Sequence, residues 1–238
     1  MCGRMAQKRK KAELVRSFGC VAEDASDVPE NYNLSPTQDA AVIRFNPADS
    51  RRHLSLLRWG LVPSWSKDPS VGIKLTNARA ESLTEKPSFR EAAFRRRCLI
   101  PVDTFYEWQR TEKVKQPYAF TSTDDTPLAL AGIWEGWRGP DGQILRTFSV
   151  VTTTANEIMA PIHDRMPVIL ATDDCPIWLG EREGDWKQLM RPCAPHLIKC
   201  WPVSRRVNSG RENDPGLLEP VNPAESHTVQ PEPLPLGL

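Results

Sequence analysis

The first four residues, Met1-Cys2-Gly3-Arg4, carry the most distinctive chemistry in the chain. Removal of Met1 would leave Cys2 with a free α-amine beside its thiol. These two groups titrate at about 8 and 8.5, so both keep a nucleophilic fraction at neutral pH. An aldehyde would form an imine with the amine, and the thiolate would then close a thiazolidine ring. Neither a lysine nor an internal cysteine can do this. From the dipeptide alone, an unremarkable second residue is the alternative.

A row of polar residues follows in the segment LTNARAES. Side chains alternate between the two faces of a β-strand, so Asn77, Arg79 and Glu81 would share one face. Ala78 and Ala80 would share the other face. Small residues behind a polar row suit a strand that lines a site, and an ordinary solvent-exposed face is the alternative.

Two candidate proton-transfer groups lie farther along the chain. Glu107 stands in the run FYEW, an aromatic setting that suits a desolvated general acid or base. His163 stands in the run PIHDRMP, where prolines fix the backbone, and loop positions on a rigid scaffold often hold proton-transfer groups. A strand-end carboxylate in water and a structural histidine are the respective alternatives.

Trp59 and Trp65 flank a Gly/Pro turn, and at least one of the two indoles is expected in the core. Aromatic side chains beside arginines also form platforms on which unpaired bases stack. No metal or other cofactor is expected, because the spacing of the soft ligands matches no standard zinc site. Those ligands are Cys175, Cys193, His196 and Cys200.

Many strands and few helices must position these residues. Apolar and β-branched runs predict strands at 41–45, 54–61, 73–81, 98–108, 118–121, 128–137, 148–153, 166–171 and 197–203. Helical patterns occur at 7–18, 88–97, 155–162 and 176–190. The run GPDG at 139–142 predicts a hairpin turn. Without regular β–α alternation, this is an α+β protein built on an antiparallel, barrel-like core with short peripheral helices.

The 238 residues fit one large domain, and we expect it to span 2–222. The Pro-rich stretch 223–238 has no aromatic residue and is expected to be disordered. No apolar run approaches the roughly 20 residues of a membrane span, and no signal peptide precedes the domain. The protein is therefore expected in the cytoplasm, at the nucleoid if bacterial or in the nucleus if eukaryotic, with its six cysteines as free thiols. No feature demands more than a monomer.

A net charge of +1 attracts no polyanion globally, so an anionic partner would need a local basic cluster. The basic runs are short, and such runs are usually solvated. They lie at 8–11, 95–97 and 205–206.

Seven segments, in order, resemble the SOS-response-associated peptidase (SRAP) family of abasic-site processing proteins. They are MCGR at 1–4, YNLSP at 32–36, RWGLVPSW at 58–65, NARAES at 77–82, CLIPVDTFYEW at 98–108, IHDRMPVIL at 162–170 and WPVSRRV at 201–207. Each is weak alone, but their ordered combination with Cys2 is specific.

The resemblance implies a β-barrel with a basic groove for single-stranded DNA. It also implies a thiazolidine link between Cys2 and a ring-opened abasic sugar, together with self-removal of Met1. By resemblance, Asn77 would hold the α-amine, while Glu107 and His163 would move protons. The implied DNA-binding residues are Arg4, Asn33, Pro36, Trp65, Arg79, Trp108 and Arg165.

Two other classes of function remain open. One is a cysteine protease that uses Cys2 and His163 on other proteins, although nothing marks a peptide pocket or an oxyanion site. The other is a non-catalytic module that binds single-stranded or modified DNA, in which Cys2 is incidental.

Overall fold

Five strands close into a barrel at the centre of the fold. The computed structural model describes residues 2–22, 27–110 and 115–222. The barrel order is β11–β10–β7–β4–β5, and β5 returns to pair with β11. Neighbouring strands are antiparallel except at the closure, where Thr147 and Phe148 lie parallel to Arg58 and Trp59. The strands are β4 (Asp39–Asn46), β5 (Arg51–Trp59), β7 (Arg97–Val102), β10 (Leu128–Arg138) and β11 (Ile144–Thr154).

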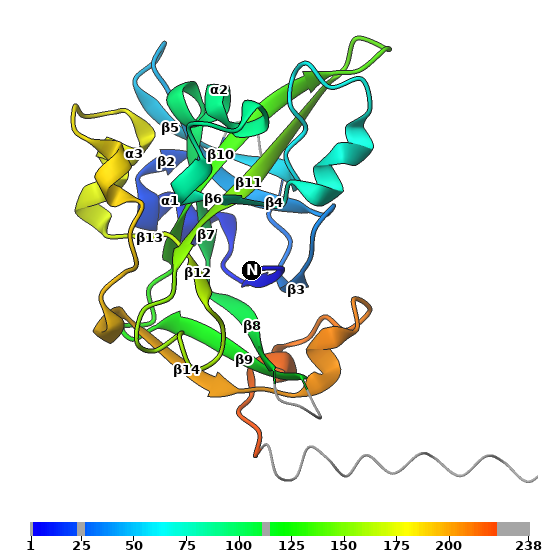
Figure 1. The fold of residues 1–238 in the computed structure, drawn as a ribbon, viewed down its shortest axis with the longest axis vertical. Coiled ribbons are helices and arrows are strands. Elements are labelled where there is room, and N and C mark those ends of the chain that lie inside the picture. Colours follow the sequence, from blue (N-terminus) through cyan, green and yellow to red (C-terminus); the bar gives the residue numbers. More distant parts are fainter. Residues whose placement is uncertain (1, 23–26, 111–114, 223–238) are drawn as a thin grey trace, which may run out of the picture.

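A second sheet lies below the barrel in Figure 1 and contains the strand that follows Cys2. Its order is β14–β9–β8–β1–β3. The strands are β1 (Arg4–Gln7), β3 (Asn31–Leu34), β8 (Thr104–Arg110), β9 (Lys115–Ser122) and β14 (Ile198–Pro202). The N-terminal strand therefore leaves the barrel region and becomes part of this lower sheet.

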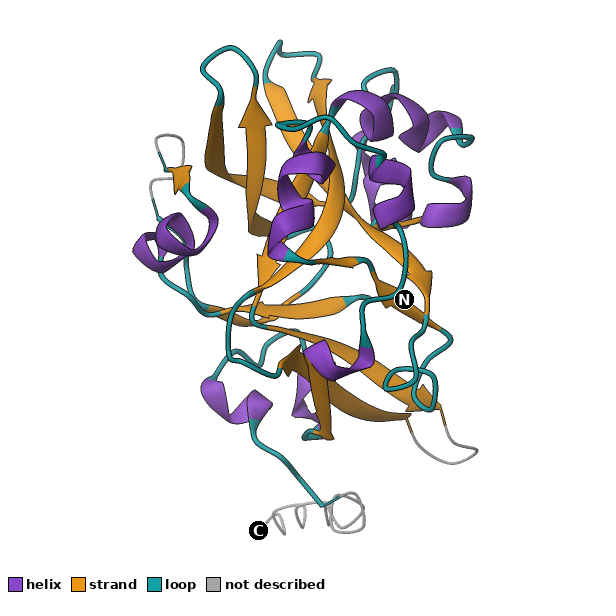
Figure 2. Cartoon of the chain, turned by 90° about the vertical axis from the view of Figure 1, so that its left-hand side faces the viewer, coloured by secondary structure: helices purple, strands orange, loops and turns teal. Residues whose placement is uncertain are grey.

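Short strands and helices surround these two sheets, with the helices on the outside (Figure 2). The strands are β2 (Cys20–Val21), β6 (Asn77–Arg79), β12 (Arg165–Pro167) and β13 (Ile169–Leu170). The α-helices are α1 (Lys11–Phe18), α2 (Pro87–Arg95) and α3 (Cys175–Leu179). The 3-10 helices are η1 (Pro69–Lys74), η2 (Ala80–Ser82), η3 (Thr172–Asp174), η4 (Trp186–Leu189), η5 (Pro195–Leu197), η6 (Arg205–Asn208) and η7 (Pro215–Leu218). The predicted α+β fold with a barrel-like core is confirmed.

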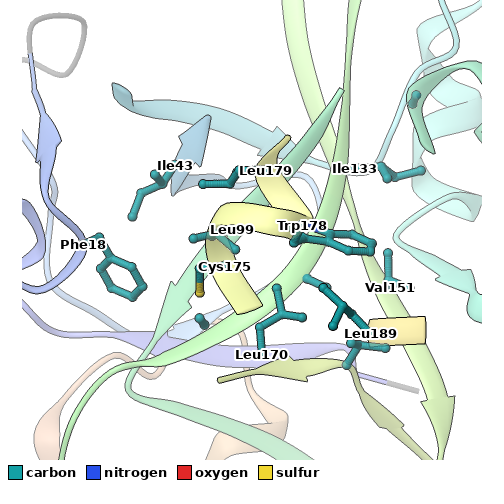
Figure 3. Packing of buried hydrophobic residues seen from close by; sticks show 14 of the residues in the cluster. Phe18, Ile43, Leu99, Ile133, Val151, Leu170, Cys175, Trp178, Leu179 and Leu189 are labelled. Carbon is teal, nitrogen blue, oxygen red and sulfur yellow. The ribbon is translucent and has the colours of Figure 1, made fainter. Parts of the chain in front are cut away.

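Alternation along the barrel strands divides the core into two layers. Val42, Ile100, Leu130 and Phe148 belong to one buried cluster, which also contains Cys2. The intervening residues form a second cluster with the helices, in which Ile43, Leu99 and Val151 are grouped with Trp178 of α3 (Figure 3). Full burial of each large apolar side chain contributes about 1.5–3 kcal/mol. The barrel is therefore a stable support for the residues around Cys2.

The side chain of Gln7 joins two barrel strands where they separate. β4 and β7 pair only at Ile43 opposite Leu99 and Arg44 opposite Cys98. Beyond that point the Gln7 amide donates to the carbonyls of Ala41 and Pro101 at 2.9 and 2.7 Å and accepts from the Ala41 N–H at 2.9 Å. Gln7 thus satisfies buried backbone groups that the ladder leaves open.

The prediction of one strand over 73–81 is wrong for most of that range. Only Asn77–Arg79 is strand, and 3-10 helices precede and follow it. The preceding loop folds back so tightly that a Cβ on Gly72 would stand 2.6 Å from the Gly60 carbonyl oxygen. Asp68 caps η1 by accepting from the Ser70 N–H. This local turn chemistry overrides the apolar pattern.

The helix predicted over 155–162 is also wrong, because the segment forms turns. Asn156 accepts from the Met159 N–H at 3.0 Å, and this side-chain bond competes with helix formation. The helix predicted over 176–190 is reduced to α3 and η4, since the chain leaves α3 at Gly180 with a positive φ of 83°.

Other predicted elements match with shifted boundaries. The strand over 98–108 is two strands that break at Asp103, and the helix over 7–18 begins only at Lys11. The hairpin at 139–142 is confirmed by a bond from the Gly142 N–H to the Gly139 carbonyl. The tail predicted at 223–238 lies outside the described residues. Among the described helices, none has both the length and the apolar character of a membrane span.

Candidate active site

Cys2 and Asn77 meet at the barrel although 75 residues separate them. The Asn77 side-chain amide donates to the Cys2 carbonyl oxygen at 2.8 Å. Asn77 is positioned by β6, which pairs in parallel with β11 and places Asn77 opposite Val150. Cys2 itself is 1% exposed. The structure therefore brings these two predicted residues together and holds the backbone beside the thiol.

Glu107 lies next to Cys2 through the pairing of β1 with β8. Arg4 is opposite Tyr106, and continuing this antiparallel register takes Gly3 and Cys2 alongside Glu107 and Trp108. The Glu107 side chain is 2% exposed. Burial raises the pKa of the Cys2 thiol, and the negative charge of Glu107 raises it further. At neutral pH the thiol is therefore protonated.

His163 lies in the turn before β12, and that turn docks against β8. The Gln109 side chain donates to the Pro161 carbonyl at 3.1 Å, and Gln109 shares a strand face with Glu107. The backbone N–H of Arg165 donates to His163 Nδ1 at 3.0 Å. Nδ1 also lies 3.2 Å from the Arg165 carbonyl oxygen and 3.0 Å from Asp164 Oδ1, so it faces one donor and two acceptors. A hollow of about 220 Å³ adjoins this turn, lined by Gln109, Pro161, Ile162, His163 and Asp164.

The expected alternation around Asn77 holds only within β6. Ala78 is buried and Arg79 is exposed, as predicted. Glu81 falls in η2, outside the strand, so the polar row of three is not formed by one strand. Arg79 lies opposite Thr152 of β11, with its side chain open to solvent.

Arg165 is held by an acidic partner. It forms a bidentate ion pair with Glu81 at 3.0 and 2.9 Å and also donates to the Thr152 carbonyl at 2.7 Å. The hydrogen bonds from Arg165 lower the pKa of the Glu81 carboxyl. Arg79 and Arg165 flank β11 on its two sides, opposite Thr152 and Thr154. Of these two arginines, Arg79 is exposed to solvent, whereas Arg165 is paired with Glu81.

Arg4 and Asn33 form a hydrogen-bonded pair. Arg4 donates to Asn33 Oδ1 at 2.8 Å and to the Asn208 carbonyl at 3.4 Å. The Asn33 amide donates to the carbonyls of Ser209 and Glu212 at 2.8 and 2.9 Å. Asn33 is 3% exposed, and its oxygen and its NH₂ group are both engaged within the protein.

The remaining predicted DNA-binding residues are Trp108, Pro36 and Trp65, and each has a different environment. The Trp108 indole donates to Asn208 Oδ1 at 2.7 Å. Pro36 is half-buried in the turn between β3 and β4. Trp65 is 65% exposed, whereas Trp59 is buried, as expected for one indole of the pair.

Sequence reasoning missed three contributors to this site. Thr152 anchors Arg165, Gln109 docks the His163 turn, and Asn208 joins Arg4 to Trp108. Each is a polar residue whose importance lies in a partner distant in sequence, so no local pattern marks it. Across the described ranges, no three His, Cys, Asp or Glu side chains are grouped to hold a metal ion.

A closed barrel that holds Cys2 beside a strand-borne asparagine and a buried glutamate defines a class of proteins. The family model for SOS response associated peptidase (SRAP) matches residues 1–210. The chain belongs to this family.

Relatives of known name support this assignment. The abasic site processing protein YoqW of Bacillus subtilis is 38% identical over 92% of this chain and 99% of its own. The abasic site processing protein HMCES of Xenopus tropicalis is 32% identical over 83% of this chain and 68% of its own. A solved structure from Bacteroides thetaiotaomicron, 24% identical, superposes with a TM-score of 0.85 over 93% of this chain and all of that one. It supports the fold alone.

Proposed function

We propose that this protein captures abasic sites in single-stranded DNA by forming a covalent thiazolidine with Cys2. The observation that carries the proposal is the contact of Cys2 with Asn77 on one side and its electrostatic interaction with Glu107 on the other. The relatives named as abasic site processing proteins support the choice of substrate. We also propose that the protein acts as a monomer.

The reaction begins with removal of Met1. Hydrolysis of the Met1–Cys2 peptide bond consumes one water and frees the Cys2 α-amine. We assign this step to the same site, acting once on its own chain. Until it occurs, the Cys2 nitrogen is an amide and cannot form an imine.

Capture then proceeds through an open-chain aldehyde. Abasic deoxyribose is mostly a closed hemiacetal, so its ring must open first. The α-amine adds to C1′ and water leaves, which gives an imine. The Cys2 sulfur then bonds to the same carbon, and the thiol proton passes to the nitrogen. The sum is peptide plus sugar minus one water, with no oxidation or reduction.

Each side chain has a role that follows from its position. Asn77 orients the backbone of Cys2 and offers its Oδ1 to the α-amine. Glu107 gives and takes the protons of ring opening and dehydration. His163 donates a proton to the sugar ring oxygen as that becomes a hydroxyl. A neutral thiol suits this order, because the amine attacks first and the sulfur second.

A crosslinking assay tests the proposal. Single strands treated with uracil glycosylase should form an adduct with the wild-type protein that survives SDS and heat. Cys2→Ala should form no stable adduct, and an unchanged yield would reject the assignment. Cys200→Ala is the matched control, since this half-buried cysteine has no assigned role.

The two competing functions give different results. A cysteine protease acting in trans would cleave a protein substrate and leave abasic strands free. A non-catalytic binding module would bind intact and abasic strands equally, and salt would release both completely.

A further inference from the structure

A loop near the C-terminal end of the described chain lies beside Arg4, two residues from Cys2. The loop spans 209–213 and follows η6, which ends at Asn208. In Figure 1 the dark-blue start of the chain lies between the cyan segment near residue 70 and the orange segment near residue 210. Asn77 bonds the Cys2 backbone from the side of the cyan segment. Arg4, which follows Cys2, bonds the Asn208 carbonyl in the orange segment. The 209–213 loop is therefore joined to Cys2 through Arg4, close to where the proposed function places the DNA strand.

We infer that Arg211 on this loop binds a DNA phosphate, and that Asn33 is the residue that positions it. This inference rests on the proposed function, because it assigns a further part of the same DNA-binding groove. It transfers Asn33 from a direct DNA contact to a positioning role.

The charge of Arg211 is available to a ligand. The residue is exposed, and its guanidinium has no partner within the described part of the chain. Its neighbour Gly210 approaches the Arg4 guanidinium, since a Cβ on Gly210 would stand 3.9 Å from both terminal nitrogens of Arg4. Arg4 is two residues from Cys2, so the loop that carries Arg211 is linked to the reactive residue through Arg4.

Neither of the nearby carboxylates is bonded to Arg211. Glu212 and Asp214 are the acidic neighbours, and both are bound by Arg206. Its Nε donates to Glu212 at 3.0 Å and its Nη2 to Asp214 at 2.5 Å. Arg206 is therefore committed to these two acids, while Arg211 is left free to meet an anion.

Asn33 holds the backbone of Arg211 from both sides. Its amide nitrogen donates to the carbonyls of Ser209 and Glu212, which bracket Arg211, at 2.8 and 2.9 Å. Its oxygen accepts from Arg4 at 2.8 Å. One buried side chain thus fixes two cations relative to each other. Such preorganisation lowers the entropy lost when a phosphate binds.

The salt dependence of binding to intact single strands tests the assignment. Each phosphate contact on a single strand contributes about 0.7 to the slope of log affinity against log salt. Arg211→Ala should remove one contact, so the ratio of wild-type to variant affinity should fall about fivefold between about 0.05 and 0.5 M salt. Arg211→Lys should restore the slope, because a phosphate accepts a point charge. Arg90→Ala, an equally exposed arginine on α2, should leave it unchanged.

Asn33→Ala should lose the same contact, and the double variant with Arg211→Ala should be no worse than Asn33→Ala alone. Additive losses would reject the positioning role. A slope for Arg211→Ala equal to that of the wild type would reject the phosphate contact itself, and this surface variant carries little folding risk.

Strands that contain an abasic site show whether Arg211 contacts a phosphate on the 5′ or the 3′ side of the lesion. Two series of abasic strands, shortened on the 5′ or the 3′ side, should be compared by their second-order crosslinking rate. In one of the two series, the wild type should lose its higher crosslinking rate relative to Arg211→Ala once the contacted phosphate has been removed. A higher wild-type rate that persists in both series would contradict the inference. If the wild type formed no crosslink at all, the proposed function would fail. The slopes on intact strands would still decide the role of Arg211.

Discussion

The side-chain amide of Asn77 donates to the carbonyl oxygen of Cys2 at 2.8 Å, and this bond joins the N-terminus to β6. The other end of the same side chain, Oδ1, is buried and has no hydrogen-bond partner in the part of the chain that the structure describes. A buried acceptor without a donor costs about 1–3 kcal/mol. The α-amine of Cys2 is the donor that would relieve this cost once Met1 is removed.

Asn77→Ala should therefore slow adduct formation more than it weakens binding. Misplacing a reacting group by about 1 Å costs on the order of 100-fold in rate. We expect a loss of about 10- to 100-fold in the rate at saturating DNA, measured by SDS gel, with affinity for intact strands nearly unchanged by anisotropy. Arg79→Ala should do the reverse. Equal losses of rate and affinity for Asn77→Ala would indicate a structural residue.

The Cys2 thiol should become more reactive when Glu107 loses its charge. Burial and the Glu107 carboxylate both raise the thiol pKa, so the thiolate fraction is small at pH 8. Glu107→Gln removes the second cause. The pKa then falls, the thiolate fraction at a given pH increases, and iodoacetamide alkylation of Cys2 accelerates because the thiolate is the nucleophile.

Peptide-resolved mass spectrometry between pH 7 and 9 measures this effect. Cys200 serves as the internal control, because only burial raises its pKa. An equal acceleration at Cys2 and Cys200 would point to a loosened fold. An unchanged alkylation rate at Cys2 would show that the Glu107 charge does not act on the Cys2 thiol. The same variant should form the DNA adduct more slowly, since proton transfer is lost.

Glu81→Gln should strengthen binding to single strands. In the free protein the Glu81 carboxylate holds Arg165 by two hydrogen bonds. Without that charge, Arg165 is free to contact a phosphate, and the salt slope should increase by about 0.7. Glu91→Gln, which breaks the exposed pair with Arg95 on α2, is the control and should leave binding unchanged. Weaker binding of Glu81→Gln would show that the pair presents Arg165 to DNA instead of withholding it.

Gln7→Ala should destabilise the whole domain. It leaves the Ala41 N–H and the carbonyls of Ala41 and Pro101 without their side-chain partner. Each unsatisfied buried group costs about 1–3 kcal/mol, so we expect a loss of about 3 kcal/mol or more in urea unfolding. Gln143→Ala, in the exposed hairpin, should change stability by less than about 0.5 kcal/mol. A loss below 1 kcal/mol for Gln7→Ala would mean that β4 and β7 close without it.

The barrel strands were predictable because their apolar runs are long and end at turn residues. The strand Arg4–Gln7 was not, since its few residues lead into the basic run KRKK and show no period of their own. The segment at 73–81 misled the pattern because the close approach of Gly60 to Gly72 is a tertiary contact. Sequence periodicity carries no information about such contacts.

The site residues were recognisable only as a set. Cys2 alone was ambiguous, and its partners came from resemblance to a family. The pairing of Arg165 with Glu81 spans 84 residues, and that of Asn33 with the 209–212 carbonyls spans more than 170. In the proposed DNA-binding site these bonds decide which cations remain available, and no local pattern predicts them.

The most direct measurement is the mass of the N-terminal tryptic peptide after reaction with an abasic strand. Trypsin cleaves after Arg4, so the peptide is Cys2-Gly3-Arg4 if Met1 has been removed. The account predicts this peptide joined to the deoxyribose remnant with the loss of one water and no alkylatable thiol. A retained Met1, or an adduct on a lysine with an unmodified Cys2, would contradict it.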